Sequence, residues 1–122
     1  TTHVWRAMRQ RARIACIEYN ASLPPSLACE VPYDIANVWD DTSWFGASLK
    51  TVEEIGRMHG MSLVGCDMRG INAFLVESAE DDKFLSPFTA EFHYEPPRYP
   101  IVTPSPGHPR SDGARGWVVP QG

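Results

Sequence analysis

The sequence predicts an α/β domain of the doubly wound type, of which it supplies only the second half. Two apolar runs, Ile14–Ile17 and Ser62–Cys66, flank a segment with helical spacing, and a short turn then leads into a third run at Ile71–Val76. A strand, a helix and a second strand in this order form a right-handed crossover with parallel strands. The short turn requires the last strand to run antiparallel to its predecessor. We therefore expect a partial parallel sheet that ends in an antiparallel hairpin.

The N-terminal segment, residues 1–11, predicts a short amphipathic helix. Its apolar side chains on one side are Val4, Trp5 and Met8. The strand at Ile14–Ile17 shows no alternation of apolar and polar residues. A continuous apolar run is typical of a strand that is covered on both faces of a parallel sheet.

A long connection and the strongest helix signal follow. Residues 21–41 contain three prolines and no apolar periodicity, and a loop of this length is usually functional or a lid. Apolar residues then recur at helical spacing, at Phe45, Leu49, Val52 and Ile55, with His59 one turn further on. We expect Thr42 or Ser43 to cap this helix, and Gly60 to adopt the left-handed conformation that ends it.

The composition changes at Ser86. Eight of the 11 prolines lie beyond this residue, and they exclude long regular elements. We expect two parts, residues 1–85 as the C-terminal half of an α/β domain and residues 86–122 as an extended, Pro-rich tail that wraps around it. A polyproline ligand for a partner protein is the alternative interpretation of the tail.

Charge and composition exclude several classes of protein. The formal net charge is −4 and the pI about 5.5, whereas nucleic acid is bound by clustered Lys and Arg. The three cysteines form no C-x-x-C pair, which argues against a disulfide scaffold and a zinc site. No stretch reaches the roughly 18 apolar residues of a membrane span. We expect a cytoplasmic protein that binds no metal, no nucleic acid and no membrane.

The end of the first strand carries the first candidate site. In open α/β sheets, ligands bind beyond the carboxyl ends of the strands. Glu18 and Asn20 lie two residues apart at this end, so in an extended strand they point to the same side. Together they suit a polar substrate group, with Glu18 as a candidate base. The alternative is structural: Glu18 caps a helix and Asn20 shapes the turn.

Aromatic and acidic residues before the long helix form the second candidate site. Tyr33, Trp39 and Asp40 belong to this cluster, which suits a small-molecule pocket. Asp40 and Asp41 offer oxygen ligands for a cation, but carboxylates near a helix N-terminus are common for electrostatic reasons alone. Asn72, at the start of the last strand, either projects to the sheet edge or satisfies the backbone of the turn.

Six short motifs follow one another along the chain. They are Ile17-Glu18-Tyr19-Asn20, Val31-Pro32-Tyr33-Asp34, Trp39-Asp40-Asp41-Thr42, Phe45-Gly46-Ala47-Ser48-Leu49, Leu63-Val64-Gly65-Cys66 and Gly70-Ile71-Asn72-Ala73-Phe74. This series resembles the C-terminal half of bacterial proteins related to FkbM-type methyltransferases, which are Rossmann-like class I enzymes that use S-adenosylmethionine. The resemblance covers Ile14 to Glu77, and more loosely Tyr94–Pro97 and Gly107–Pro109.

The resemblance implies that the two halves of a domain bind different molecules. The first half, with a glycine-rich turn and an acidic strand end, would hold S-adenosylmethionine, and the chain contains neither feature. Glu18 and Asn20 would face a small hydroxyl- or sugar-containing acceptor substrate. Tyr33, Trp39 and Asp40 would lie on the loop over it, and this chain would be inactive alone. The alternative function is a non-catalytic α/β module that binds a ligand or a partner.

The same resemblance has a consequence for assembly. If the first strand normally pairs with a strand of the other half, its edge is exposed here. Exposed strand edges recruit other chains. We therefore expect a homo-oligomer formed through the strand from Ile14 to Tyr19.

Overall fold

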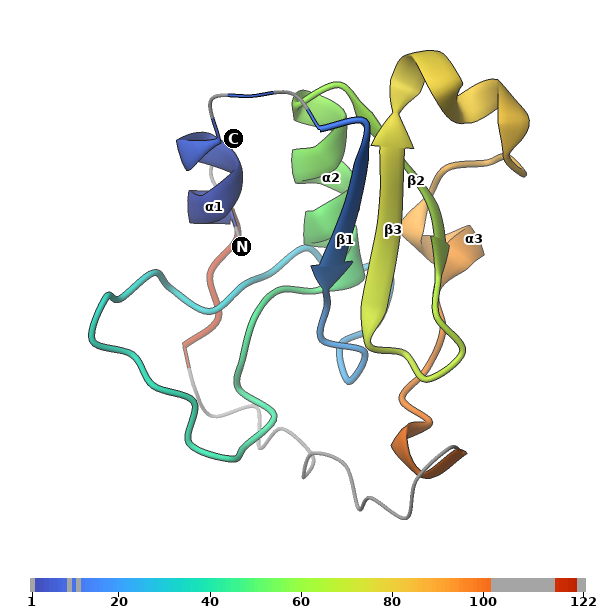
Figure 1. The fold of residues 1–122 in the computed structure, drawn as a ribbon. Helices are drawn as coiled ribbons and strands as arrows, with labels where there is room; N and C mark the ends of the chain where they lie inside the picture. Colours follow the sequence, from blue (N-terminus) through green and yellow to red (C-terminus); the bar gives the residue numbers. More distant parts are fainter. Residues whose placement is uncertain (1, 9, 11, 102–115, 121–122) are drawn as a thin grey trace.

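The fold is a small three-stranded antiparallel sheet with one long helix packed on it (Figure 1). The computed structural model describes residues 2–8, 10, 12–101 and 116–120. The elements are α1 (Thr2–Ala7), β1 (Ile14–Glu18), α2 (Leu49–Met58), β2 (Met61–Cys66), β3 (Asn72–Glu77), the 3₁₀ helix η1 (Ser78–Lys83), α3 (Ala90–His93) and the 3₁₀ helix η2 (Tyr99–Ile101).

The prediction of a doubly wound, Rossmann-like sheet is wrong. The strand order is β1-β3-β2, and β3 pairs antiparallel with both of its neighbours. Cys16 lies opposite Phe74 in one pairing, and Leu63 opposite Leu75 in the other. β1 and β2 therefore run in the same direction, as a crossover through α2 requires, but β3 lies between them. The described residues contain no parallel strand pair.

The short helices η1, α3 and η2 were not predicted, whereas α1 and the three strands agree with the sequence and α2 differs at its start. This helix begins at Leu49, where Ser48 is the N-cap and its Oγ accepts a hydrogen bond from the Thr51 N–H at 3.2 Å. The expected caps, Thr42 and Ser43, lie in an irregular segment instead. Gly60 has a φ of 75°, which confirms the left-handed residue expected at the end of the helix.

Only one face of β1 is covered, which contradicts the expectation from its apolar run. Ala15 and Ile17 are half-buried and pack against the core, whereas Ile14 is 70% exposed. In Figure 1, α2 lies behind β1 and β3, and no described helix lies in front of these two strands. β1 therefore has the alternating burial of a strand in a two-layer fold.

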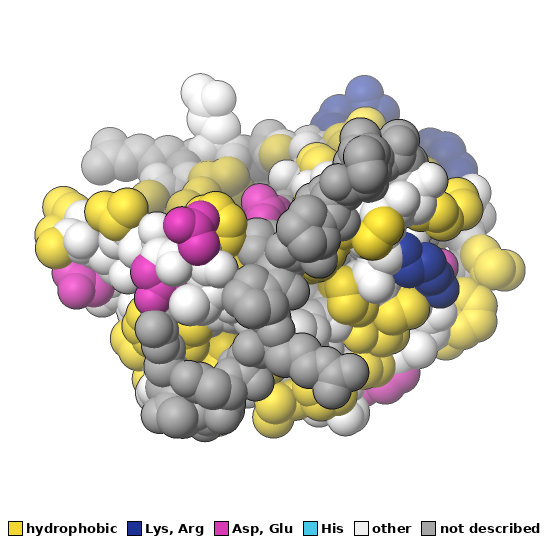
Figure 2. Space-filling view, turned by 90° about the horizontal axis from the view of Figure 1, so that it is seen from below, with side chains coloured by type: hydrophobic (Ala, Val, Ile, Leu, Met, Phe, Trp, Pro, Cys, Tyr) yellow, Lys and Arg dark blue, Asp and Glu magenta, His cyan; other side chains and the backbone are white. Residues whose placement is uncertain are grey.

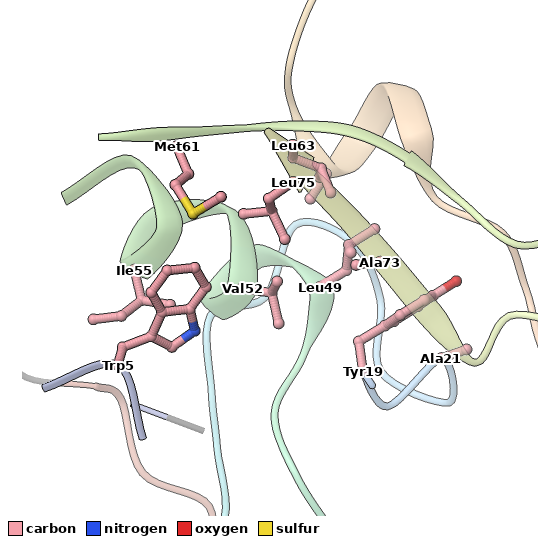
Figure 3. Packing of buried hydrophobic residues seen from close by; sticks show 11 residues of the cluster. Trp5, Tyr19, Ala21, Leu49, Val52, Ile55, Met61, Leu63, Ala73 and Leu75 are labelled. Atoms are coloured by element: carbon pink, nitrogen blue, oxygen red, sulfur yellow. The ribbon is translucent and has the colours of Figure 1, made fainter. Parts of the chain in front are cut away.

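The core lies between the sheet and the two N-terminal helices. Trp5 of α1 is 1% exposed and lies beside Ile55 of α2 and Met61 of β2 (Figure 3). Leu63 and Leu75 from the sheet fill the space above α2. One tryptophan thus anchors the short helix α1, which is too short to be stable by itself.

A buried carboxylate joins α3 to α2. Glu53 is 3% exposed, and its Oε2 accepts hydrogen bonds from the Ala90 N–H at 2.7 Å and from Lys50 Nζ at 2.9 Å.

The residues that follow α3 lie against the ends of the strands. Val118, much later in the chain, pairs with Glu30. The loosely matching motif Gly107–Pro109 lies outside the described residues.

Candidate functional site

A polar cavity of about 180 Å³ lies between α1 and the loop that follows Glu30. Its lining residues are His3, Glu30, Val31, Pro32, Tyr33, Asp34, Asn37 and Gly46. The backbone fixes both sides of the loop, because the Val31 N–H donates to the Gly46 carbonyl at 2.9 Å. Two segments that are distant along the sequence, α1 and residues 30–46, therefore form one site.

A stacked pair of rings forms one wall of this cavity. The rings of His3 and Tyr33 lie 3.9 Å apart with an interplanar angle of 16°. Tyr33 is 63% exposed, so the ring stays accessible from solvent. A flat aromatic surface of this kind packs against another ring or against the C–H face of a sugar.

Two carboxylates, Glu30 and Asp34, line the cavity. Glu30 Oε2 accepts a hydrogen bond from the Thr2 N–H at 3.1 Å, which holds the start of α1 beside the loop. Asp34 Oδ1 accepts from the Ala36 N–H at 2.9 Å and closes a tight turn. Figure 2 shows acidic side chains on the left of the lower face, the side on which this loop lies in Figure 1. This environment favours hydrogen-bond donors and cations over anions.

The first predicted site, at the end of β1, does not assemble as a pair. Asn20 is fully buried, and its Nδ2 donates to the carbonyls of Ser43 at 2.7 Å and Phe45 at 3.1 Å. Its Oδ1 accepts a hydrogen bond from the Ser22 N–H. Glu18 is exposed and is the last residue of β1, so the alternation of the strand does not continue to Asn20. Asn20 therefore uses its hydrogen-bonding groups within the protein.

The second predicted site is divided. Of its three residues, only Tyr33 lines the cavity. Trp39 Nε1 donates to the Thr42 carbonyl at 2.8 Å, and Asp40 Oδ1 accepts from Thr42 Oγ1 at 2.6 Å. These bonds stabilise a local turn in which Asp41 has a φ of 63°. Trp39 and Asp40 thus shape the loop that carries Tyr33.

Asn72 is the first residue of β3 and closes the turn between β2 and β3. Its Nδ2 donates to Asp67 Oδ2 at 2.9 Å, and the backbone N–H groups of Arg69, Ile71 and Asn72 donate to the same carboxylate. Burial alone would raise the pKa of Asp67, but these hydrogen bonds together lower it. The carboxylate organises the turn.

A half-buried thiol, Cys66, and a buried phenol, Tyr19, meet beside the ends of β1 and β2. Burial raises the pKa of the Cys66 thiol to about 11, although a hydrogen bond with Tyr19 opposes this rise. Burial also raises the pKa of Tyr19, and the neighbouring Cys66 adds to the effect. Both groups are protonated at neutral pH, which makes them poor nucleophiles.

A second cavity, of about 200 Å³, lies beside Trp5 and is mainly apolar. Its lining residues are Trp5, Met8, Gln10, Ala12, His59, Met61 and Glu77. Sequence reasoning missed this cavity, and it also missed His3, Glu30 and Asn37 in the polar one. No local pattern marks these residues, because the approach of α1 to the loop brings them together.

Within the described ranges, no three His, Cys, Asp or Glu side chains are grouped so that they could hold a metal ion. No described helix is long and apolar enough to cross a membrane. Comparison with protein-family models, with curated proteins and with solved structures finds no significant match to this chain. The candidate site therefore stands on its own geometry.

Proposed function

We propose that this chain is a non-catalytic binding module that holds a small, neutral or cationic molecule rich in hydroxyl or amine groups. The ligand lies in the polar cavity against the stacked rings of His3 and Tyr33. The observation that carries the proposal is this stack, 3.9 Å between ring centroids, as one wall of a cavity of about 180 Å³.

The size and chemistry of the cavity select the class of ligand. Sites for drug-sized molecules usually enclose about 300–1,000 Å³, so this cavity suits a molecule the size of a single sugar ring. The carboxylates of Glu30 and Asp34 accept hydrogen bonds from hydroxyl or amine groups, and they repel phosphates and carboxylates. Tyr33 packs against the apolar face of the ring. A sugar or an amino sugar combines these properties.

The lining residues support binding rather than catalysis. No Ser, Cys, Thr or Lys is among the described residues that line the cavity. Its carboxylates belong to a residue class that can act in covalent catalysis, but Glu30 and Asp34 each accept a backbone hydrogen bond that holds α1 or the loop in place. The methyltransferase function implied by the resemblance stays a prediction. So does a cytoplasmic location. Asn20, which the resemblance assigns to the acceptor site, donates to a backbone carbonyl, and Asn72, a candidate from its place at the start of the last strand, donates to the Asp67 carboxylate.

The test is a titration of the ¹⁵N-labelled chain with glucose, glucosamine and glucose 6-phosphate, followed by NMR. We expect saturable shifts of the backbone signals of His3, Tyr33 and Asn37 with glucose or glucosamine, and none with the phosphate. Tyr33→Ala should weaken binding at least tenfold. Ile35→Ala is the matched control, because Ile35 is 90% exposed on the same loop and does not line the cavity.

Two outcomes would contradict the proposal. One is the absence of saturable shifts with both neutral and cationic probes at millimolar concentration. The other is binding that Tyr33→Ala and Ile35→Ala affect equally. A parallel titration with S-adenosylmethionine examines the other function: saturable binding that Tyr33→Ala leaves unchanged would favour the methyltransferase interpretation.

A further inference from the structure

The backbone hydrogen bonds of β1 define a free edge. At one end of the strand, the Glu77 N–H donates to the Arg13 carbonyl, and at the other end the Tyr19 N–H donates to the Ile71 carbonyl, both at 2.9 Å. Backbone groups in a strand alternate in direction. The odd-numbered residues from 13 to 19 therefore direct their backbone groups toward β3. Ile14, Cys16 and Glu18 direct theirs away from it.

No described strand lies on that outer side of β1. β1 is the first strand in the order β1-β3-β2, and backbone pairing on its outer side begins only where the Asn20 N–H donates to the Ala47 carbonyl at 2.8 Å. Three N–H groups and three carbonyl groups thus face outward. Such a row is a template for a further strand.

We propose that β1 pairs antiparallel with β1 of a second copy of this chain, about a two-fold axis at Cys16. In this register Cys16 faces Cys16 of the copy, and Ile14 faces Glu18. All three outward residues of each chain then lie in hydrogen-bonded pairs, which gives about six hydrogen bonds, two for each pair. A shift by two residues loses one pair, and a shift by one turns the side chains to the wrong faces.

The side chains of β1 suit this arrangement. Antiparallel pairing separates the two Glu18 side chains, because they lie at opposite ends of the paired strands, while Arg13 stays paired with Glu80 of its own chain at 3.1 Å. Cys16 lies beside Phe74, which is 37% exposed on the uncovered face. The row Phe74–Cys16 of one chain continues into Cys16–Phe74 of the other. The apolar row on the uncovered face is thus continuous across the proposed interface.

A disulfide between the two Cys16 side chains tests the proposed register. Residues in a hydrogen-bonded antiparallel pair have Cα atoms about 5.5 Å apart, which a disulfide can span. We expect mild oxidation to yield a covalent dimer linked through Cys16. In a Cys16→Ser background, Ile14→Cys and Glu18→Cys should each fail to form disulfide-linked dimers on their own, because neither residue faces its own copy. Mixed together, they should link to each other.

A backbone variant and amide exchange test the pairing without a disulfide. Cys16→Pro removes one outward N–H and no bond to β3, so it should yield a monomer, whereas Cys16→Ser should remain dimeric by light scattering. Amide exchange by NMR should slow at Ile14, Cys16 and Glu18 as the concentration rises. Exchange at Ala15 and Ile17 should not change, because β3 already protects them.

A monomer at every concentration, with fast exchange at the three outward amides, would overturn the proposal. So would a dimer in which those amides stay unprotected, because its interface would lie elsewhere. If Cys16→Pro unfolds, amide exchange on the unmodified chain still shows whether the outward amides of β1 are protected in a dimer. The ligand titration tests the cavity beside Tyr33 and not the edge of β1. The proposed binding function can therefore be wrong while the proposed dimer is right, and the reverse.

Discussion

Tyr19 and Tyr94 each donate a hydroxyl hydrogen bond to the backbone beside the other. Tyr19 Oη lies 2.6 Å from the Glu95 carbonyl oxygen, and Tyr94 Oη lies 2.5 Å from the Ala21 carbonyl oxygen. Tyr19 directly follows β1, and Tyr94 directly follows α3. This reciprocal pair holds the segment after α3 against the end of the sheet.

Removing either hydroxyl should destabilise the fold. Tyr19 is 1% exposed, so Tyr19→Phe leaves the Glu95 carbonyl without this donor and should cost about 1–3 kcal/mol. Tyr94→Phe should cost about 1 kcal/mol. Urea unfolding measures both, with the exposed Tyr33→Phe as control. Equal stability of all three variants would show that the pair contributes nothing.

Gly70 should tolerate no side chain, because two constraints meet there. Its φ is +71°, and an added Cβ would lie 2.5 Å from the carbonyl oxygen of Pro96. Gly46→Ala is a matched control, since Gly46 has a φ of +60° with no atom within 4 Å of the added carbon. We expect a loss of about 1 kcal/mol for Gly46→Ala, from the left-handed backbone alone. The loss for Gly70→Ala should exceed it by more than about 1 kcal/mol in urea unfolding. Similar losses would mean that the segment at Pro96 moves away freely.

The turn at Asp67 should make stability depend on pH. Burial tends to raise the pKa of this carboxyl, but four hydrogen bonds, donated by Asn72, Ile71 and Arg69, lower it below its unfolded value. The ionised group therefore stabilises the fold above the unfolded pKa of about 4, and this contribution is lost as the pH falls through the folded pKa.

Asp67→Asn removes this dependence. It should lower the free energy of unfolding at pH 7 by about 1–3 kcal/mol and reduce the further loss below pH 4. Urea midpoints measured across this range provide the test. Asp82→Asn, at an exposed position, is the control. An acid profile of Asp67→Asn that matches the unmodified chain would assign the loss to other carboxyls.

The three cysteines should react with iodoacetamide in a fixed order. Cys16 is exposed, whereas Cys29 is buried and Cys66 half-buried, and burial raises the pKa of both of these thiols. At pH 8 we expect alkylation at Cys16 first, and at the other two only after unfolding in urea. Mass spectrometry of the peptides locates the labels. Labelling of Cys66 as fast as Cys16 would contradict the burial at the ends of the strands.

Most local structure was predictable because its causes are local. The apolar runs predicted all three strands, and helical spacing predicted α2 from Leu49 onward. Gly60 ends the helix as expected, since a left-handed residue favours glycine in any context. The start of α2 was missed because both Thr42 and Ser48 are good caps. The choice between them depends on Cys29, whose N–H donates to Ser48 Oγ across 19 residues.

The sequence by itself determined the three strands, the helices α1 and α2, the order of these elements and the antiparallel hairpin, because spacing and turn length act over a few residues. Only the tertiary structure decided that β3 lies between β1 and β2, since strand pairing is non-local and both arrangements satisfy the same apolar pattern. It also decided that Asn20 donates to backbone carbonyls and that the ring of Tyr33 stacks on that of His3. A residue type shows which bonds are possible, whereas the packing of distant segments selects the partner.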